Sequence, residues 1–211
     1  MRGALFRRVA LLPSAVATPP GSRRRAVAME ITFTKTGART YEVVARRDDG
    51  VTLRVRTPDK PLAIPHDMAH YVVEREMSFD GGFWGSIAAG AVFGTVQIVS
   101  GRQPPHVAEQ SAALIKASYR EQAAAELYVA VMQRIASEGK ERDWRYVNSC
   151  LDEVWRPFRW PRPPVTAEDA LRVCRALREA GERWVALPVG EAVTVTWSSA
   201  QRKGAAERGR A

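Results

Sequence analysis

Three consecutive segments, 31–34, 41–46 and 51–56, alternate apolar and polar residues with a period of two, and no other feature constrains the fold as strongly. This alternation is typical of strands with one buried face, because successive side chains point to opposite sides of a sheet. Gly37 and the pair Asp49-Gly50 lie between the segments, where tight turns favour glycine. The pattern predicts a three-stranded antiparallel meander whose apolar face needs a cover.

Helical periodicity in the middle of the chain supplies that cover. Apolar residues there recur at spacings of three and four, and prolines or Thr166 precede several of the segments, as they do at helix starts. The predicted helices span 66–77, 83–92, 106–137 and 142–156, and a last one follows Thr166 and stops at Gly181.

Two further apolar segments, 184–187 and 193–197, flank a Pro188-Val189-Gly190 turn and predict a C-terminal β-hairpin. The order of elements is therefore strands, then helices, then a hairpin. Because strands and helices do not alternate, an α+β fold is expected, with an N-terminal three-stranded meander, central helices and a C-terminal β-hairpin.

The positive charge of the chain is concentrated at its two ends. The 211 residues have a net charge of +9. Residues 1–28 contain six arginines and no acidic residue, and residues 201–211 contain four basic residues and one acidic residue. Residues 29–200 contain 22 of each kind, so their net charge is zero. We therefore expect a single α+β domain over 29–200 between disordered basic tails, and we do not expect a nucleic-acid partner.

Two segments raise the question of targeting or membrane insertion. Residues 1–28 begin like a secretory signal, but Pro13 interrupts the apolar run, so a disordered extension or a start at Met29 fits better. Residues 81–101 contain no charged residue, and their length alone would permit a membrane span. Their six glycines and lack of leucine favour a buried helix followed by a loop or strand at 95–99. We expect no membrane span.

The two cysteines, Cys150 and Cys174, match neither a disulfide framework nor a zinc-binding spacing. Buried reduced thiols and a cytoplasmic location are the expectation that follows. The chain is rich in arginine and alanine and has only five lysines, a bias that GC-rich bacterial genomes produce.

Two of the three histidines, His66 and His70, lie four residues apart on the predicted helix 66–77. This spacing places both imidazoles on one helix face, where they can share a tetrahedral zinc ion. The segment His66-Asp67-Met68-Ala69-His70 resembles the HExxH motif of the zincin metalloproteases over five residues, and it departs at the catalytic position, where Asp67 replaces glutamate. The resemblance implies zinc on the two histidines with Asp67 as the general base, and Glu74, one turn past His70, is a second candidate for the base.

A third metal ligand does not appear at a zincin spacing. Glu74 can pair with His70 on a metal, but about 12 Å of helix rise separates it from His66, so one ion does not take all three. Asp80, His106 and Glu109 stay open as the third ligand, with His106 preferred.

The alternative interpretation is structural: His66 bonds a neighbouring loop at the helix start, and His70 bonds a buried group. No phosphate-binding glycine loop, nucleophile elbow or complete catalytic triad is visible. The leading hypothesis is therefore a non-enzymatic domain that binds an unidentified protein or small molecule without a cofactor. The second hypothesis is a zinc-dependent hydrolase centred on His66 and His70.

Overall fold

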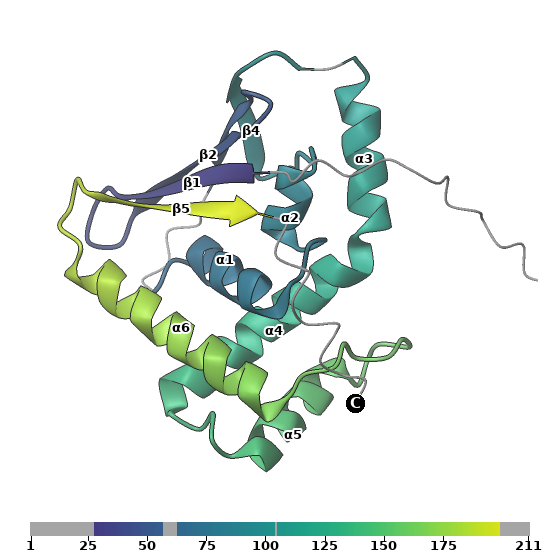
Figure 1. Cartoon of the computed structure of the whole chain (residues 1–211), viewed down its shortest axis with the longest axis vertical. Helices are drawn as coiled ribbons and strands as arrows, with labels where there is room; N and C mark the ends of the chain where they lie inside the picture. The colour runs from purple at the N-terminus through teal and green to yellow at the C-terminus, as the bar shows by residue number, and fades with distance from the viewer. Residues whose placement is uncertain (1–27, 57–62, 104, 199–211) are drawn as a thin grey trace, which may run out of the picture.

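Within the described residues, five strands form one antiparallel sheet (Figure 1), and their order across it is β4-β3-β2-β1-β5. The structure, a computed structural model, describes residues 28–56, 63–103 and 105–198. The predicted disordered tails fall almost entirely on residues 1–27 and 199–211, outside the described ranges. The strands are β1 Ala28–Lys35, β2 Tyr41–Arg47, β3 Thr52–Val55, β4 Val96–Ser100 and β5 Ala192–Ser198.

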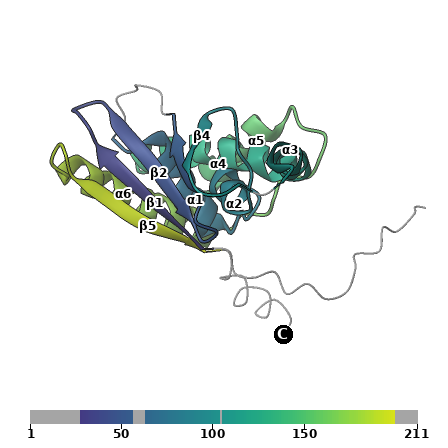
Figure 2. The same ribbon diagram turned by 90° about the horizontal axis from the view of Figure 1, so that it is seen from above.

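The described residues also form six helices, and α1 and α6 lie against one side of the sheet, which confirms the α+β fold (Figures 1 and 2). The six helices are α1 His66–Met77, α2 Phe83–Ala88, α3 Val107–Ala117, α4 Tyr119–Glu138, α5 Trp144–Trp155 and α6 Ala167–Ala186. Helix α1 lies between the sheet and the other long helices, and α5 packs on α4 farther from the strands (Figure 1).

The predicted meander is confirmed, with the predicted face buried. Ile31 and Phe33 of β1 are fully buried and are paired in register with Ala45 and Val43 of β2. The opposite face is polar, and the hydroxyls of Thr32 and Thr194 lie 3.0 Å apart across β1 and β5. Burial of one face explains the strict alternation, because a shift by one residue would turn every apolar side chain to solvent.

The C-terminal region differs from the prediction in its first arm. Helix α6 begins at the predicted cap, where Thr166 and Asp169 form a reciprocal capping box, but it passes through Gly181 and ends at Ala186. Gly181 has no positive φ and is buried against Ile64, so it serves close packing rather than termination. The side-chain amine of Lys35 donates to the carbonyls of Trp184 and Leu187, which satisfies the end of the helix. The remaining strand, β5, pairs with β1 instead of forming a local hairpin.

The predicted helix 106–137 is two helices, α3 and α4, which change direction at Ser118 (Figure 1). The Ser118 hydroxyl donates to the carbonyl of Leu114 at 2.7 Å, a bond that competes with continued helix. The uncharged segment 81–101 folds as the buried helix α2 and the strand β4, as expected. Among the described residues, no helix combines the length and the apolar composition that a membrane span requires.

The short helix α2 begins against a buried carboxylate from α1. Glu74 is 0% exposed, and its two oxygens accept hydrogen bonds from the backbone N–H groups of Phe83 and Trp84 at 2.8 and 2.9 Å. These are N–H groups of the first turn, which have no partner inside the helix. Gly82 precedes them with an ordinary φ of −68°, and a Cβ there would overlap the Glu74 carboxyl group. Residue 82 therefore has to be glycine for reasons of space.

We expect Gly82→Ala to destabilise the protein by about 1–3 kcal/mol, because the added methyl group displaces the Glu74 carboxyl group. Gly94→Ala is the matched control, since a Cβ at Gly94 meets nothing within 4 Å, and it should change the stability by less than about 1 kcal/mol. Urea unfolding of both variants measures the difference. Equal midpoints for the two would contradict the close contact between Gly82 and Glu74.

Candidate metal centre

His66 and His70 occupy the first two turns of α1, on the side that faces α4. The chain enters α1 through Pro65, whose extended conformation (φ −53°, ψ 138°) makes His66 the first helical residue. The two imidazole rings pack edge to face with their centroids 4.7 Å apart. Glu126 projects from α4 toward both rings, with its Oε2 3.3 Å from His70 Nε2 and 4.0 Å from His66 Nε2.

Helix α1 is buried on all sides, although it carries the ionisable residues Asp67, His70 and Glu74. Residues 67–74 of this helix are all buried, because the sheet, α4 and α6 surround it. Buried ionisable groups require partners. His70 is 3% exposed and has a carboxylate on each ring nitrogen: Glu74 Oε1 lies 3.0 Å from Nδ1, and Glu126 lies at Nε2.

The charge on His70 follows from these two carboxylates. Burial of the imidazole lowers its pKa, but the bonds to Glu126 and Glu74 outweigh burial and raise the pKa to about 10. The bond to His70 in turn lowers the pKa of Glu126. Burial raises the pKa of Glu74, although the bonds from His70, Phe83 and Trp84 oppose that effect. With a carboxylate facing each ring nitrogen, the surroundings of His70 favour its doubly protonated form.

The same three side chains approach the geometry of a zinc site. One donor atom each from His66, His70 and Glu126 lies within 4.8 Å of the other two, while the donor atoms of a tetrahedral zinc site are roughly 3.3 Å apart. The pair His70–Glu126 already has that separation at 3.3 Å, whereas His66 Nε2 lies 4.0 Å from Glu126 and has to move inward. Histidines that bind metals generally donate their second ring N–H to a carboxylate, which holds the ring in position. Glu74 provides this bond to Nδ1 of His70.

A groove opens beside His70 and Glu126, and we call it the aromatic groove. Its volume is about 470 Å³, within the range of small-molecule sites. The lining residues are His70, Phe83, Phe93, Gly94, Thr95, Tyr119, Gln122, Ala123 and Glu126. A ligand in this groove would contact the side of the cluster that the protein leaves open.

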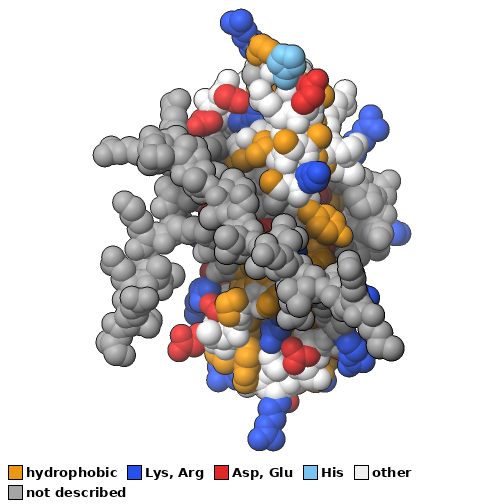
Figure 3. Space-filling view, turned by 90° about the vertical axis from the view of Figure 1, so that its right-hand side faces the viewer, with side chains coloured by type: hydrophobic (Ala, Val, Ile, Leu, Met, Phe, Trp, Pro, Cys, Tyr) orange, Lys and Arg blue, Asp and Glu red, His pale blue; other side chains and the backbone are white. Residues whose placement is uncertain are grey.

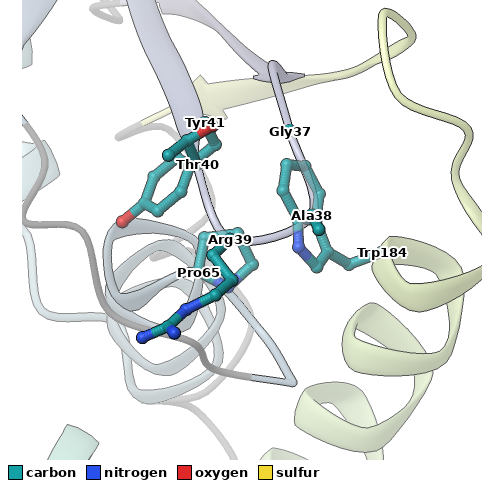
Figure 4. A pocket seen from close by; sticks show the side chains of 7 residues that line it. All are labelled: Gly37, Ala38, Arg39, Thr40, Tyr41, Pro65 and Trp184. Atoms are coloured by element: carbon teal, nitrogen blue, oxygen red, sulfur yellow. The ribbon is translucent and has the colours of Figure 1, made fainter.

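Asp67, the sequence-predicted base, faces β2 rather than the groove. It is 8% exposed, and its carboxylate accepts a hydrogen bond of 2.8 Å from the hydroxyl of Tyr41. Burial raises the pKa of both groups. Tyr41 and Trp184 border a hollow of about 20 Å³, which holds no more than a water molecule (Figure 4). Asp67 thus anchors α1 to β2.

The structure does not bring the sequence-predicted third ligand to the histidine pair. His106 is the N-cap residue of α3, its side chain is 78% exposed, and its ring faces Glu109 at 3.9 Å. Within the described ranges, the candidate metal-binding group is His66, His70 and Glu126. It does not include His106, Glu109 or Asp80.

Glu126, which the sequence did not indicate as a ligand, is the third residue of the candidate metal-binding group. It follows three alanines and precedes Leu127 in α4, within the predicted helix 106–137. The only sign in the sequence is that the charged Glu126 borders an apolar helix face. Its partners are 56 and 60 residues away in the chain, so only the packing of α4 against α1 identifies them.

Comparisons with known proteins found no matching family model, no similar curated protein and no similar solved structure. The interpretation of the site therefore depends on its geometry.

The two carboxylates that bond His70 should differ sharply in their contribution to stability. Glu74→Gln should cost about 3–5 kcal/mol, because it removes a buried charge that has three donors. Glu126→Gln is the matched control and should cost less than about 1 kcal/mol, since the Glu126 side chain is 62% exposed. Chemical unfolding in a chelator measures both, and equal losses would contradict the assignment of Glu74 as the buried support.

Proposed function

We propose that this protein binds one zinc ion through His66, His70 and Glu126 and acts as a zinc-dependent hydrolase on a ligand held in the aromatic groove. The observation that carries the proposal is the position of His70, whose Nδ1 is bonded to the buried Glu74 while Nε2 faces Glu126 and the groove. This bond from Nδ1 fixes the direction in which Nε2 of the buried His70 points.

The number of protein ligands favours a catalytic over a structural zinc site. Structural sites are usually closed by four protein ligands, whereas catalytic sites have three and leave one position for water or substrate. Three groups converge here, and the groove lies beside them. A bound zinc ion would supply a water of lowered pKa and would polarise a carbonyl group.

The remaining roles follow from where the side chains lie. Glu74 is a positioning residue: it is fully buried behind His70 and holds Nε2 toward the ion. Asp67, bonded to Tyr41, is a support of α1 in this proposal rather than a general base. Glu126 is the exposed ligand and neutralises one of the two positive charges of the ion.

Elemental analysis of untagged, full-length protein after exposure to equimolar zinc tests the site. We expect about one zinc per chain, and a loss of binding of at least tenfold in His66→Ala, His70→Ala and Glu126→Ala. His106→Ala is the control and should bind zinc normally, because His106 lies outside the cluster. Circular dichroism confirms that each variant is folded. Zinc binding that depends on His106 but not on His66 would contradict the proposal.

A second candidate function is the non-enzymatic binding domain of the sequence analysis. The observation in its favour is another groove, between α4 and α6, with a volume of about 850 Å³ and a lining that includes Ile64, Leu177 and the exposed Val185. A protein that takes up no zinc but keeps its fold would support this candidate over the hydrolase.

Two further features bear on partners and location. On the face of Figure 3, basic and acidic side chains are interspersed among the coloured residues, which supports the proposal that nucleic acid is not the partner. Cys150 and Cys174 are both buried free thiols, which supports a reducing compartment such as the cytoplasm.

A further inference from the structure

We infer that the aromatic groove selects an uncharged aromatic acyl group, whose carbonyl-type oxygen is directed at the metal. This inference rests on the proposed zinc site and names the class of ligand that the site takes.

Aromatic side chains run outward from the metal ligands. The Phe83 ring packs edge to face on His70, with centroids 6.1 Å apart, and stacks on Phe93 at 5.2 Å and 27°. Tyr119, at the start of α4, also lines the groove, and it is 59% exposed. Flat apolar walls of this kind favour a planar apolar group, since aromatic pairs gain energy beyond the burial of area.

The residues that line the groove disfavour an acyl group with a negative charge. The described lining residues contain no lysine or arginine, so an anionic substituent would have no cationic side chain to pair with in the groove. Beyond the metal, the polar lining is limited to neutral groups such as Thr95 and Gln122, and the Gln122 amide already donates to Ser118 and to the carbonyl of Ile115. The double charge of zinc is balanced by Glu126 and by Glu74 behind His70.

Tyr119 is the residue through which this inference is best tested. It is mainly exposed, and its recorded ring contact is with Trp160 at 6.4 Å, so its replacement leaves the core intact. Phe83 and Phe93 are partly buried against the core and are less suitable, because their loss also changes stability.

Hydroxamates are suitable probes, because the same head group binds zinc while the acyl group varies. The experiment compares acetohydroxamate, benzohydroxamate and 4-carboxybenzohydroxamate by calorimetry on the zinc-loaded full chain. We expect benzohydroxamate to bind at least about tenfold more tightly than each of the other two, which corresponds to roughly 1.4 kcal/mol. Tyr119→Ala should reduce this preference severalfold, and Tyr119→Phe should retain it. Val189→Ala, at an exposed apolar residue outside the groove, is the matched control and should leave the preference unchanged.

The outcomes separate this inference from the proposed function. Equal affinities of acetohydroxamate and benzohydroxamate for the zinc-loaded protein would overturn the inference and leave the zinc site standing. Tighter binding of the carboxylated probe would also overturn it. Failure to bind zinc at all would overturn the proposed function, and the inference with it.

Discussion

The buried carboxylate of Glu74 is the interaction on which the rest of the structure depends. A carboxylate removed from water is costly unless donors replace its hydration, and here the backbone N–H groups of Phe83 and Trp84 and the Nδ1 of His70 all point at it. These bonds join the middle of α1 to the start of α2 and fix the imidazole between them. The contact also requires a residue without a side chain at Gly82. One group thereby sets the path of the backbone and the orientation of the histidine.

The orientation of His70 is what turns a buried ion pair into a candidate metal centre. With Nδ1 bonded to Glu74, Nε2 faces Glu126 and the edge of the groove. A proton on Nε2 gives an ion-pair cluster, and zinc in its place gives a three-ligand site that also uses His66. The two interpretations make different demands on His66, because an ion-pair cluster needs only His70 and its two carboxylates. In the structure His66 packs edge to face on His70 and lies 4.0 Å from Glu126, within reach of the proposed ion.

Local signals predicted the parts of this fold that depend on neighbours in sequence. Helix α1 spans 66–77, as predicted from a preceding proline and a following glycine pair, and Thr166 caps α6 as expected. The prediction that Gly181 ends α6 was wrong, because glycine suits both a helix end and a close contact. Only the packing of Gly181 against Ala63 and Ile64 distinguishes the two roles. The role of Glu74 as a support, and the presence of Glu126 at the site, arise from the packing of three helices and leave little trace in the sequence.

Long-range ¹H–¹⁵N NMR of the imidazole nitrogens tests the central claim most directly, since the chain has only three histidines. The account predicts that His70 is protonated on both nitrogens in the zinc-free protein at neutral pH. On addition of equimolar zinc, Nε2 of His70 and one nitrogen of His66 should shift to metal-bound values, while Nδ1 of His70 keeps its hydrogen and His106 is unchanged. Spectra in which zinc leaves His66 and His70 unaltered would contradict the metal centre. A His70 that carries no hydrogen on Nδ1 would contradict its support by Glu74.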